Sequence, residues 1–156
     1  MDSSQFLKLC HATSVALGCA DKDALGNSHT IDIDGVNIAL FFEEHFSPDH
    51  ILCYIDIGPL PAFRREEILE RILAINLLTA TKTSGVYGLD QARDSLIFVQ
   101  HFVSPELLSG EKLAKILSNY SAHSISIKQN LLDPNNLRPL PTILADSLDQ
   151  HLHHLA

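Results

Sequence analysis

The stretch Ile57-Gly58-Pro59-Leu60-Pro61, followed by the helical run from Ile68 to Asn76, decides the fold of this chain. Gly58-Pro59 ends a strand, because proline has no backbone N–H to give to a sheet ladder. At 100° per residue, the helix that follows spreads its mostly apolar positions over an arc of about 200°, where one buried stripe needs only about 100°. The positions on this arc are Ile75, Ile68, Ile72, Asn76, Leu69, Leu73 and Leu77. We therefore expect two partners for this helix, its own sheet and a second subunit.

Length and composition indicate one compact domain. The chain has 156 residues, of which 46% are hydrophobic and 19% charged, as in ordinary globular proteins. The net charge of −8 makes duplex nucleic acid and anionic membranes poor partners, since both favour Lys and Arg. No apolar run reaches the ~18 residues of a membrane span, and Asp2 stands where a secretory signal carries positive charge. Cys10, Cys19 and Cys53 form no CxxC motif, so reduced thiols in a cytosol are expected.

A first helix is predicted close to the N-terminus. Ser3 or Ser4 can cap it, and Gly18 can end it. Its positions at helical spacing are Phe6, Leu9, Cys10, Thr13 and Leu17. This spacing is typical of a helix that packs one side against the protein.

Asp34-Gly35 is the clearest hairpin signal in the chain. Both central residues of a type I′ turn need positive φ, which Asp-Gly tolerates, and this turn would pair Ile33 with Val36. Period-two alternation then places one set of apolar residues on a common face: Ile31, Ile33, Val36, Ile38, Leu40 and Phe42. We expect that set to be core, which leaves Ala39 and Phe41 on the outward face.

The remaining segments complete an α-β-β-β-α-β-β-α order. A polar loop (43–50) precedes the expected elements: strand 51–57, helix 62–78, strands 86–89 and 96–103, and a last helix to about 131. The strand at 96–103 is apolar on both faces, as in a strand buried on both sides. Ser104-Pro105 is a helix-start signal, although Gly110 leaves the start open. The tight hairpin makes the fold class α+β, with a mainly antiparallel five-stranded sheet and three helices.

The composition changes after Asp133. A linker rich in Pro and Asn precedes a short amphipathic helix marked by Ile143, Leu144, Leu148, Leu152 and Leu155. We therefore expect one domain over residues 1–132 and an appended segment over 133–156, with no internal repeat.

Three stretches together carry a family resemblance. They are Ile57-Gly58-Pro59-Leu60-Pro61, the helix from Leu69 that ends in Ile75-Asn76, and Gly85-Val86-Tyr87-Gly88-Leu89-Asp90 before the strand from Leu96. In these residues and in its element order, from about Phe6 to Leu132, the chain resembles the class I type III secretion chaperones, the Tir-chaperone family. It departs from that pattern in having no tryptophan and a longer tail.

The resemblance implies a small acidic homodimer of the bacterial cytoplasm. Such a protein binds the N-terminal segment of a secreted effector, keeps it extended and soluble, and helps to deliver it to the secretion apparatus, without enzymatic activity or a cofactor. An extended client offers backbone hydrogen bonds to a sheet edge and side chains to apolar pockets. We expect a client groove formed by Phe6, Leu9, Ala39 and Phe41. The expected dimer interface is Ile68, Leu69, Ile72, Leu73 and Asn76.

Alternatives stay open at this point. The apolar cluster of the central helix could be wholly intrachain core if another element covers it. A different function on the same fold is a regulator or adaptor that holds a folded partner, such as a transcription factor. Enzymatic and metal sites are weakly indicated, because the nine histidines are scattered without HExxH or zinc-finger spacing. His151, His153 and His154 could catch a metal only incidentally.

Overall fold

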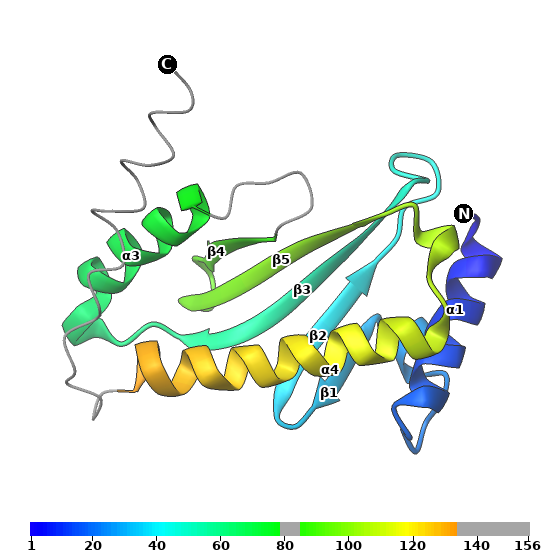
Figure 1. Ribbon diagram of the computed structural model, residues 1–156, viewed down its shortest axis with the longest axis horizontal. Coiled ribbons are helices and arrows are strands. Elements are labelled where there is room, and N and C mark those ends of the chain that lie inside the picture. The colour runs from blue at the N-terminus through cyan, green and yellow to red at the C-terminus, as the bar shows by residue number, and fades with distance from the viewer. Residues whose placement is uncertain (79–84, 134–156) are drawn as a thin grey trace.

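The computed structural model describes residues 1–78 and 85–133, which form a five-stranded antiparallel sheet with strand order β1-β2-β3-β5-β4. The helix α4 lies along one face of this sheet, and α1 and α3 lie near its opposite ends (Figure 1). The helices are α1 (Ser3–Ala16), α2 (Ala24–Ser28), α3 (Arg65–Leu78) and α4 (Gly110–Ile127). The strands are β1 (Thr30–Ile33), β2 (Val36–Phe41), β3 (His50–Pro59), β4 (Val86–Asp90) and β5 (Ser95–Val103). The expected α+β class and element order are confirmed.

The β1–β2 hairpin has the predicted turn and register. Asp34 and Gly35 have φ values of 54° and 79°, as a type I′ turn requires. Ile33 pairs with Val36, and the backbone N–H of Gly35 donates to Asp32 Oδ1 at 3.0 Å. The predicted apolar face of this hairpin packs into the core, where Ile38 and Leu40 are fully buried.

Helix α1 begins one residue earlier than expected. Its N-cap is Asp2, not Ser3 or Ser4, because the Asp2 carboxylate accepts from the Gln5 N–H while the Gln5 side chain accepts from the Asp2 N–H. Gly18, at φ 72°, follows the helix as predicted. The short helix α2 was not predicted, and it buries Leu25 completely.

The start of the last helix also differs from the prediction. Ser104 adopts φ 53° and precedes a 3-10 turn (Pro105–Leu107), while α4 itself begins at Gly110 with Ser109 as its N-cap. A Cβ on Gly110 would lie 2.5 Å from Ala12 Cβ, so only glycine lets α1 and α4 approach this closely. Gly110, which left the predicted start of this helix open, is therefore the residue at which α4 packs closely against α1.

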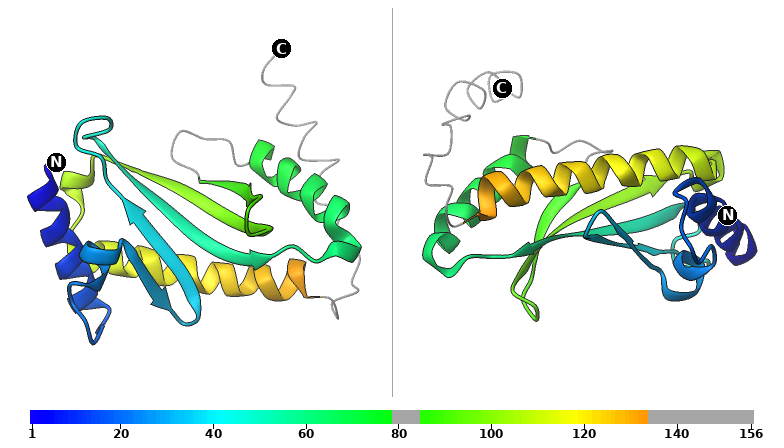
Figure 2. Two further views of the ribbon diagram at one scale, coloured as in Figure 1. Left: turned by 180° about the vertical axis from the view of Figure 1, so that it is seen from behind. Right: turned by 90° about the horizontal axis from the view of Figure 1, so that it is seen from below.

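Strand β3 separates the two faces of the sheet. Its odd-numbered residues Ile51, Cys53 and Ile55 are fully buried under the helices, and its even-numbered residues face the other side. Figure 2 shows that the second face carries no helix, with α4 behind the strands in the left-hand view. The prediction that strand 96–103 is buried on both faces is wrong for this chain, because nothing described covers the side of β5 that presents His101 and Val103.

Helix α3 turns part of its apolar arc inward. Ile68 and Ile72 are buried in the core, whereas Leu73 and Leu77 are 69% and 64% exposed. The expected helix at 143–155 and the histidines from His151 onward lie outside the described residues.

Candidate functional site

The open face of the sheet holds a groove of about 830 Å³. Residues from β1, β2, β3 and β5 form its floor, and the β2–β3 loop and β4–β5 turn form its ends. The lining is Thr30, Asn37, Ala39, Phe41, Glu43, Ser47, His50, Leu52, Tyr54, Asp56, Asp90, Arg93, Ile97 and His101. A cavity this size lies in the usual range for binding sites, so this face is the candidate functional site.

Strand pairing orders the groove into levels. Phe41 pairs with Leu52, and Ala39 pairs with Tyr54 one level further along. The Phe41 ring meets the Tyr54 ring edge-on, with centroids 5.5 Å apart. The middle of the groove is therefore apolar and aromatic, with the small side chain of Ala39 beside the Tyr54 ring.

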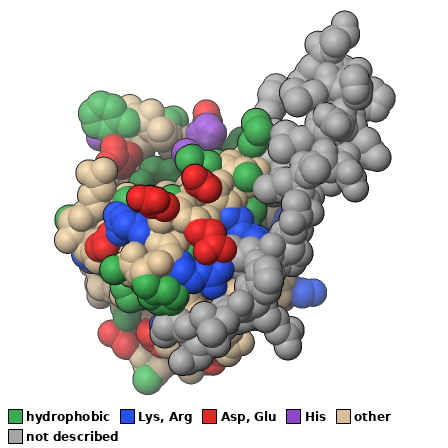
Figure 3. Space-filling model, turned by 90° about the vertical axis from the view of Figure 1, so that its left-hand side faces the viewer, with side chains coloured by type: hydrophobic (Ala, Val, Ile, Leu, Met, Phe, Trp, Pro, Cys, Tyr) green, Lys and Arg blue, Asp and Glu red, His purple; other side chains and the backbone are tan. Residues whose placement is uncertain are grey.

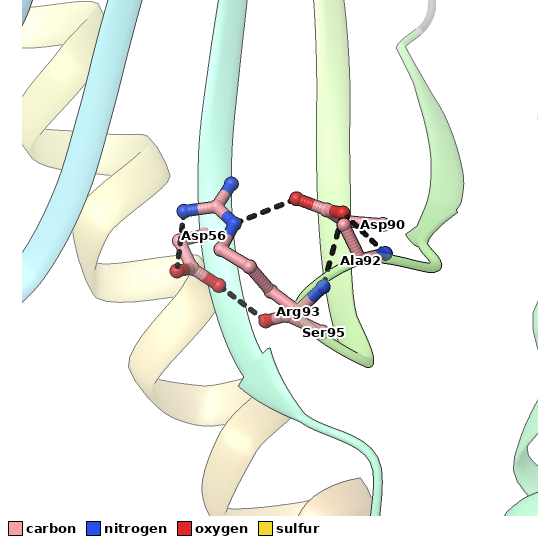
Figure 4. A network of polar contacts seen from close by, with 5 residues as sticks. All are labelled: Asp56, Asp90, Ala92, Arg93 and Ser95. Carbon is pink, nitrogen blue, oxygen red and sulfur yellow. Dashed lines mark hydrogen bonds and ion pairs between the residues drawn. The ribbon is translucent and has the colours of Figure 1, made fainter.

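Polar groups occupy the end of the groove near the β4–β5 turn. Arg93 Nε donates to Asp90 Oδ2 at 2.6 Å, while the Arg93 guanidinium lies 4.0 Å from Asp56 Oδ2 (Figure 4). Ser95 Oγ donates to Asp56 Oδ1 at 2.6 Å. The hydrogen bond from Arg93 lowers the pKa of the Asp90 carboxyl, which is therefore ionised at neutral pH.

The opposite end of the groove lies beside the β2–β3 loop. His50 and His101 face each other there, with ring centroids 6.4 Å apart. The loop is fastened to α1, because Ser3 donates to Glu44 Oε2 from both its N–H (3.0 Å) and its hydroxyl (2.6 Å). These two hydrogen bonds lower the pKa of Glu44. The N-terminal turn of α1 thus holds one wall of the groove in place.

The predicted client-binding residues divide into two pairs. Ala39 and Phe41 line the groove as expected, and Phe41 is 43% exposed. Phe6 and Leu9 are only 4% and 7% exposed, so their expected place on the same surface is wrong. Helix α1 instead turns them into the core, where Phe6 stacks on Phe42 at 5.3 Å.

One side chain links the two pairs. The ring of His29 lies 6.3 Å from the Phe6 ring and 5.9 Å from the Phe41 ring. His29 follows α2 with φ 58°, a left-handed conformation that carries the chain around the edge of the sheet. The aromatic series therefore continues from the core to the groove through a residue that sequence reasoning did not single out.

The predicted interface residues on α3 are also divided. Ile68 and Ile72 are core residues, which the intrachain alternative allowed for, and Leu69 is half-buried. Asn76 is engaged within the chain, since its side chain accepts from the Tyr87 N–H at 2.8 Å and donates to the Tyr87 carbonyl at 2.9 Å. Of the predicted set, Leu73 is the residue left exposed.

Further apolar side chains are exposed at the same end of the molecule. Leu77 lies one turn after Leu73, and Val86 of β4 is 46% exposed. Figure 3 views this end and shows hydrophobic side chains among charged ones of both signs. Leu73, Leu77 and Val86 are therefore exposed apolar side chains on a surface that also carries charged groups.

The described part of the chain contains no group of three His, Cys, Asp or Glu side chains placed to hold a metal ion. None of the described helices combines the length and hydropathy that a transmembrane span requires. Burial raises the pKa of the Cys10 and Cys53 thiols to about 12, so neither thiol is a nucleophile at neutral pH.

Sequence reasoning missed most of the groove floor. His50, Leu52, Tyr54 and Asp56 all line it, and they alternate with the buried residues of the same strand. The period-two pattern could have assigned them to one face. The contributions of Arg93 and the loop residues depend on how distant segments meet in space, which that pattern does not contain.

The fold and the groove can now be compared with known proteins. The sequence profile of the Tir chaperone protein (CesT) family matches residues 15–128. The chain therefore belongs to this family, as the resemblance implied.

Solved structures agree with this assignment at the level of the fold. A chain in the crystal structure of the ExsC-ExsE complex is similar, with a TM-score of 0.63 and 14% identity over 86% of this chain and 99% of that one. A chain in the structure of the HopA1-SchA chaperone-effector complex is also similar, with a TM-score of 0.55 and 18% identity over 83% of this chain and 98% of that one. A search of characterised protein sequences gave no significant match.

Proposed function

We propose that this protein binds the N-terminal segment of a type III secreted effector in extended form and keeps it soluble and competent for secretion. The observation that carries the proposal is the groove on the open face, whose lining follows β3 from His50 to Asp56 and is therefore long enough for an extended segment. Family membership supports it. One of the structures with the same fold is described as a chaperone-effector complex, which agrees with this function.

A free strand edge beside the groove supports the same function. In the two-residue β1–β2 hairpin, Ile33–Val36 and Ile31–Ile38 are the hydrogen-bonded pairs, and Asp32–Asn37 is the non-hydrogen-bonded pair between them. The N–H and C=O of Asp32 therefore point away from β2. Among the described residues, no strand pairs with that edge of β1. An extended client segment can add to this edge through backbone hydrogen bonds, which are largely independent of side-chain identity.

Both edges of the sheet are partly occupied by side chains of the chain itself. The side chain of Asn76 holds both the N–H and the C=O of Tyr87 on the outer edge of β4. On β1, the Ser28 hydroxyl bonds both the N–H and the C=O of Thr30. A client strand that adds to β1 would therefore pair with the backbone of Asp32.

Membership of the Tir chaperone family also favours a non-enzymatic role in the bacterial cytoplasm. The alternative, a regulator or adaptor for a folded partner, would use a broader and flatter surface. The groove therefore favours the chaperone over that alternative.

Purification from the native bacterium tests the function. We expect an effector to co-purify and limited proteolysis to leave a short protected peptide from its N-terminal region. Amide exchange of the bound protein should be slowed on β1 and β3. A partner that stays intact under protease, as a folded domain does, would contradict the chaperone function and favour the adaptor.

We also propose that the chain forms a homodimer through the exposed side of α3 and the neighbouring β4. Leu73, Leu77 and Val86 supply the exposed apolar area there, and two-fold self-association is the commonest way to cover such a surface. The buried residues Ile68 and Ile72 support this surface from below.

Light scattering tests the dimer. The wild-type particle should have about twice the chain mass of 17.2 kDa at micromolar concentration. The double variant Leu73→Asp/Leu77→Asp should be monomeric and folded, because both positions are exposed in the single chain. Leu107→Asp is the matched control, since Leu107 is similarly exposed on a different element, and it should stay dimeric. A wild-type mass of one chain would refute the dimer.

A further inference from the structure

The groove runs along β3, whose residues His50, Leu52, Tyr54 and Asp56 all contribute to its lining. Successive outward residues of a strand are about 6.6 Å apart, so these four positions span about 20 Å. An extended client segment presents its side chains at the same interval. A segment that lies along β3 can therefore place alternate side chains at successive levels of the groove.

Two adjacent levels differ in chemistry. At the level of Tyr54, the small Ala39 leaves room for an apolar side chain beside the aromatic rings. At the next level, Asp56 pairs with Ile97 and presents a carboxylate to the groove, which Asn37 also lines. The floor thus offers an apolar position and an anionic position two residues apart.

The groove carries negative charge that its own arginine does not balance. The lining contains three carboxylates, Glu43, Asp56 and Asp90, and Arg93 as its single Lys or Arg. Its formal charge is therefore −2 with the histidines neutral. Arg93 binds Asp90 at 2.6 Å and reaches Asp56 only at 4.0 Å. Ser95 donates to Asp56 Oδ1, whereas the other carboxylate oxygen, Oδ2, has Arg93 only at 4.0 Å and belongs to a side chain that is 32% exposed, so a client cation could approach it.

We propose that the groove selects client segments in which a Lys or Arg lies two positions from an apolar residue. The apolar side chain binds beside Ala39 and Tyr54, and the cation binds Asp56. Arg93 competes for the same carboxylate and moderates the preference. This inference rests on the proposed function and adds a sequence preference to it.

Electrostatics favours a basic client over an acidic one in two ways. A cation at Asp56 gains an ion pair within walls that are partly apolar, where screening by water is reduced. An acidic side chain in that place meets the net negative charge of the groove and of the chain, which is −8. Attraction of basic client segments and repulsion of acidic ones together produce specificity.

Amide NMR titration with synthetic peptides tests the inference, because it measures weak binding and locates it. The probe is a serine- and threonine-rich peptide with one Leu-Thr-Lys segment, compared with peptides that carry norleucine or glutamate in place of lysine. We expect the lysine peptide to bind about three- to five-fold more tightly than the norleucine peptide, and the glutamate peptide to bind more weakly than both. The shifted amides should include those of β3.

Three variants assign the preference to its residue. Asp56→Asn should abolish the lysine preference and keep the norleucine affinity, since asparagine still accepts from Ser95. Arg93→Gln should increase the lysine preference about two-fold or more, because the competing cation is gone. Asp94→Asn is the matched control: it removes one charge from a neighbouring position that pairs with Arg65 outside the groove, and it should keep the preference.

Several results would overturn the inference. Equal binding of the lysine and norleucine peptides would remove the preference, and an Asp94→Asn effect equal to that of Asp56→Asn would assign it to overall charge. Failure of all peptides to bind, while a native effector still co-purifies, would refute this use of the groove and leave the proposed function standing. If, in addition, Ala39→Leu made the protein monomeric, the groove would belong to a second copy of the chain.

Discussion

The two faces of the sheet differ although they are made from the same strands. On β3, Cys53 and Ile55 are fully buried beneath the helices, while Tyr54 between them borders an open groove. The covered face is mainly apolar, with the buried Gln100 opposite Cys53 as a polar exception, whereas the open face mixes aromatic rings, histidines and ion pairs. Stability and binding are therefore divided between alternate residues of one strand, so neighbouring substitutions should have different consequences.

The largest expected effect is a difference in the free energy of unfolding between substitutions on the two faces. Ile55→Ala should lower the free energy of unfolding by about 2–5 kcal/mol, because it leaves a cavity in the core. Tyr54→Ala should lower it by less than about 1 kcal/mol, since the ring borders solvent and packs chiefly against Phe41. Urea denaturation at a fixed protein concentration measures both values. Equal losses would show that the open face is also part of the stabilising core.

The next expected effect is a loss of stability at alkaline pH, caused by the buried thiols of Cys10 and Cys53. Burial raises the pKa of Cys10 and Cys53 from the ordinary value of 9.0 to about 12. Between these values the unfolded chain loses the thiol protons and the folded chain keeps them. The stabilisation is therefore fully present below about pH 9 and is lost as the pH rises toward 12, by about 1.4 kcal/mol per pH unit for each thiol.

Denaturation curves at pH 8, 9 and 10 measure this slope. The variant Cys10→Ala/Cys53→Ala should be less stable at pH 8 but should show a flatter dependence on pH. Alkylation offers an independent check, because the half-buried Cys19 should react in the native protein while the other two cysteines should not. An unchanged slope in the variant would assign the alkaline loss to other groups, such as Tyr87 and Tyr120, whose pKa values burial also raises.

The fold could be predicted from the sequence because local signals agreed with the long-range arrangement. Asp34-Gly35 specified both a turn and a register, and the stretch at Gly58-Pro59 specified where a strand ends. Helix boundaries were less predictable where two signals competed. Ser104-Pro105 resembled a helix start, yet the close approach of α1 to Gly110 determined where α4 begins.

The candidate site was only partly predictable. Alternation placed Ala39 and Phe41 on the outward face, and the structure puts both in the groove. The same periodicity argument failed for Phe6 and Leu9, because an amphipathic helix shows which residues share a side but not which side another element covers. The polar contacts of Asp56 join it to Arg93 and Ser95, which lie 37 and 39 positions further along the chain, and no periodic pattern records such contacts.

The smallest expected effect on stability tests the open face directly. Phe41→Asp should weaken client binding by about ten-fold or more, equivalent to about 1.4 kcal/mol, because it places a charge at an apolar contact. The free energy of unfolding should change by less than about 1 kcal/mol, since Phe41 is 43% exposed and contacts only the rings of His29 and Tyr54 among its aromatic neighbours. Client affinity and urea stability are measured on the same preparation.

Two neighbouring phenylalanines make this test specific to the groove. Phe46→Asp changes a side chain that is 85% exposed on the adjacent loop and does not line the groove, so it should alter neither binding nor stability. Phe42→Asp changes the next residue of the chain, which stacks on the buried Phe6, so it should destabilise the fold. If Phe41→Asp behaved like Phe42→Asp, the outward face of β2 would be structural, and the division of roles between alternate residues would not hold on that strand. If it behaved like Phe46→Asp, the client would bind elsewhere, and the free edge of β1 would be the next surface to test.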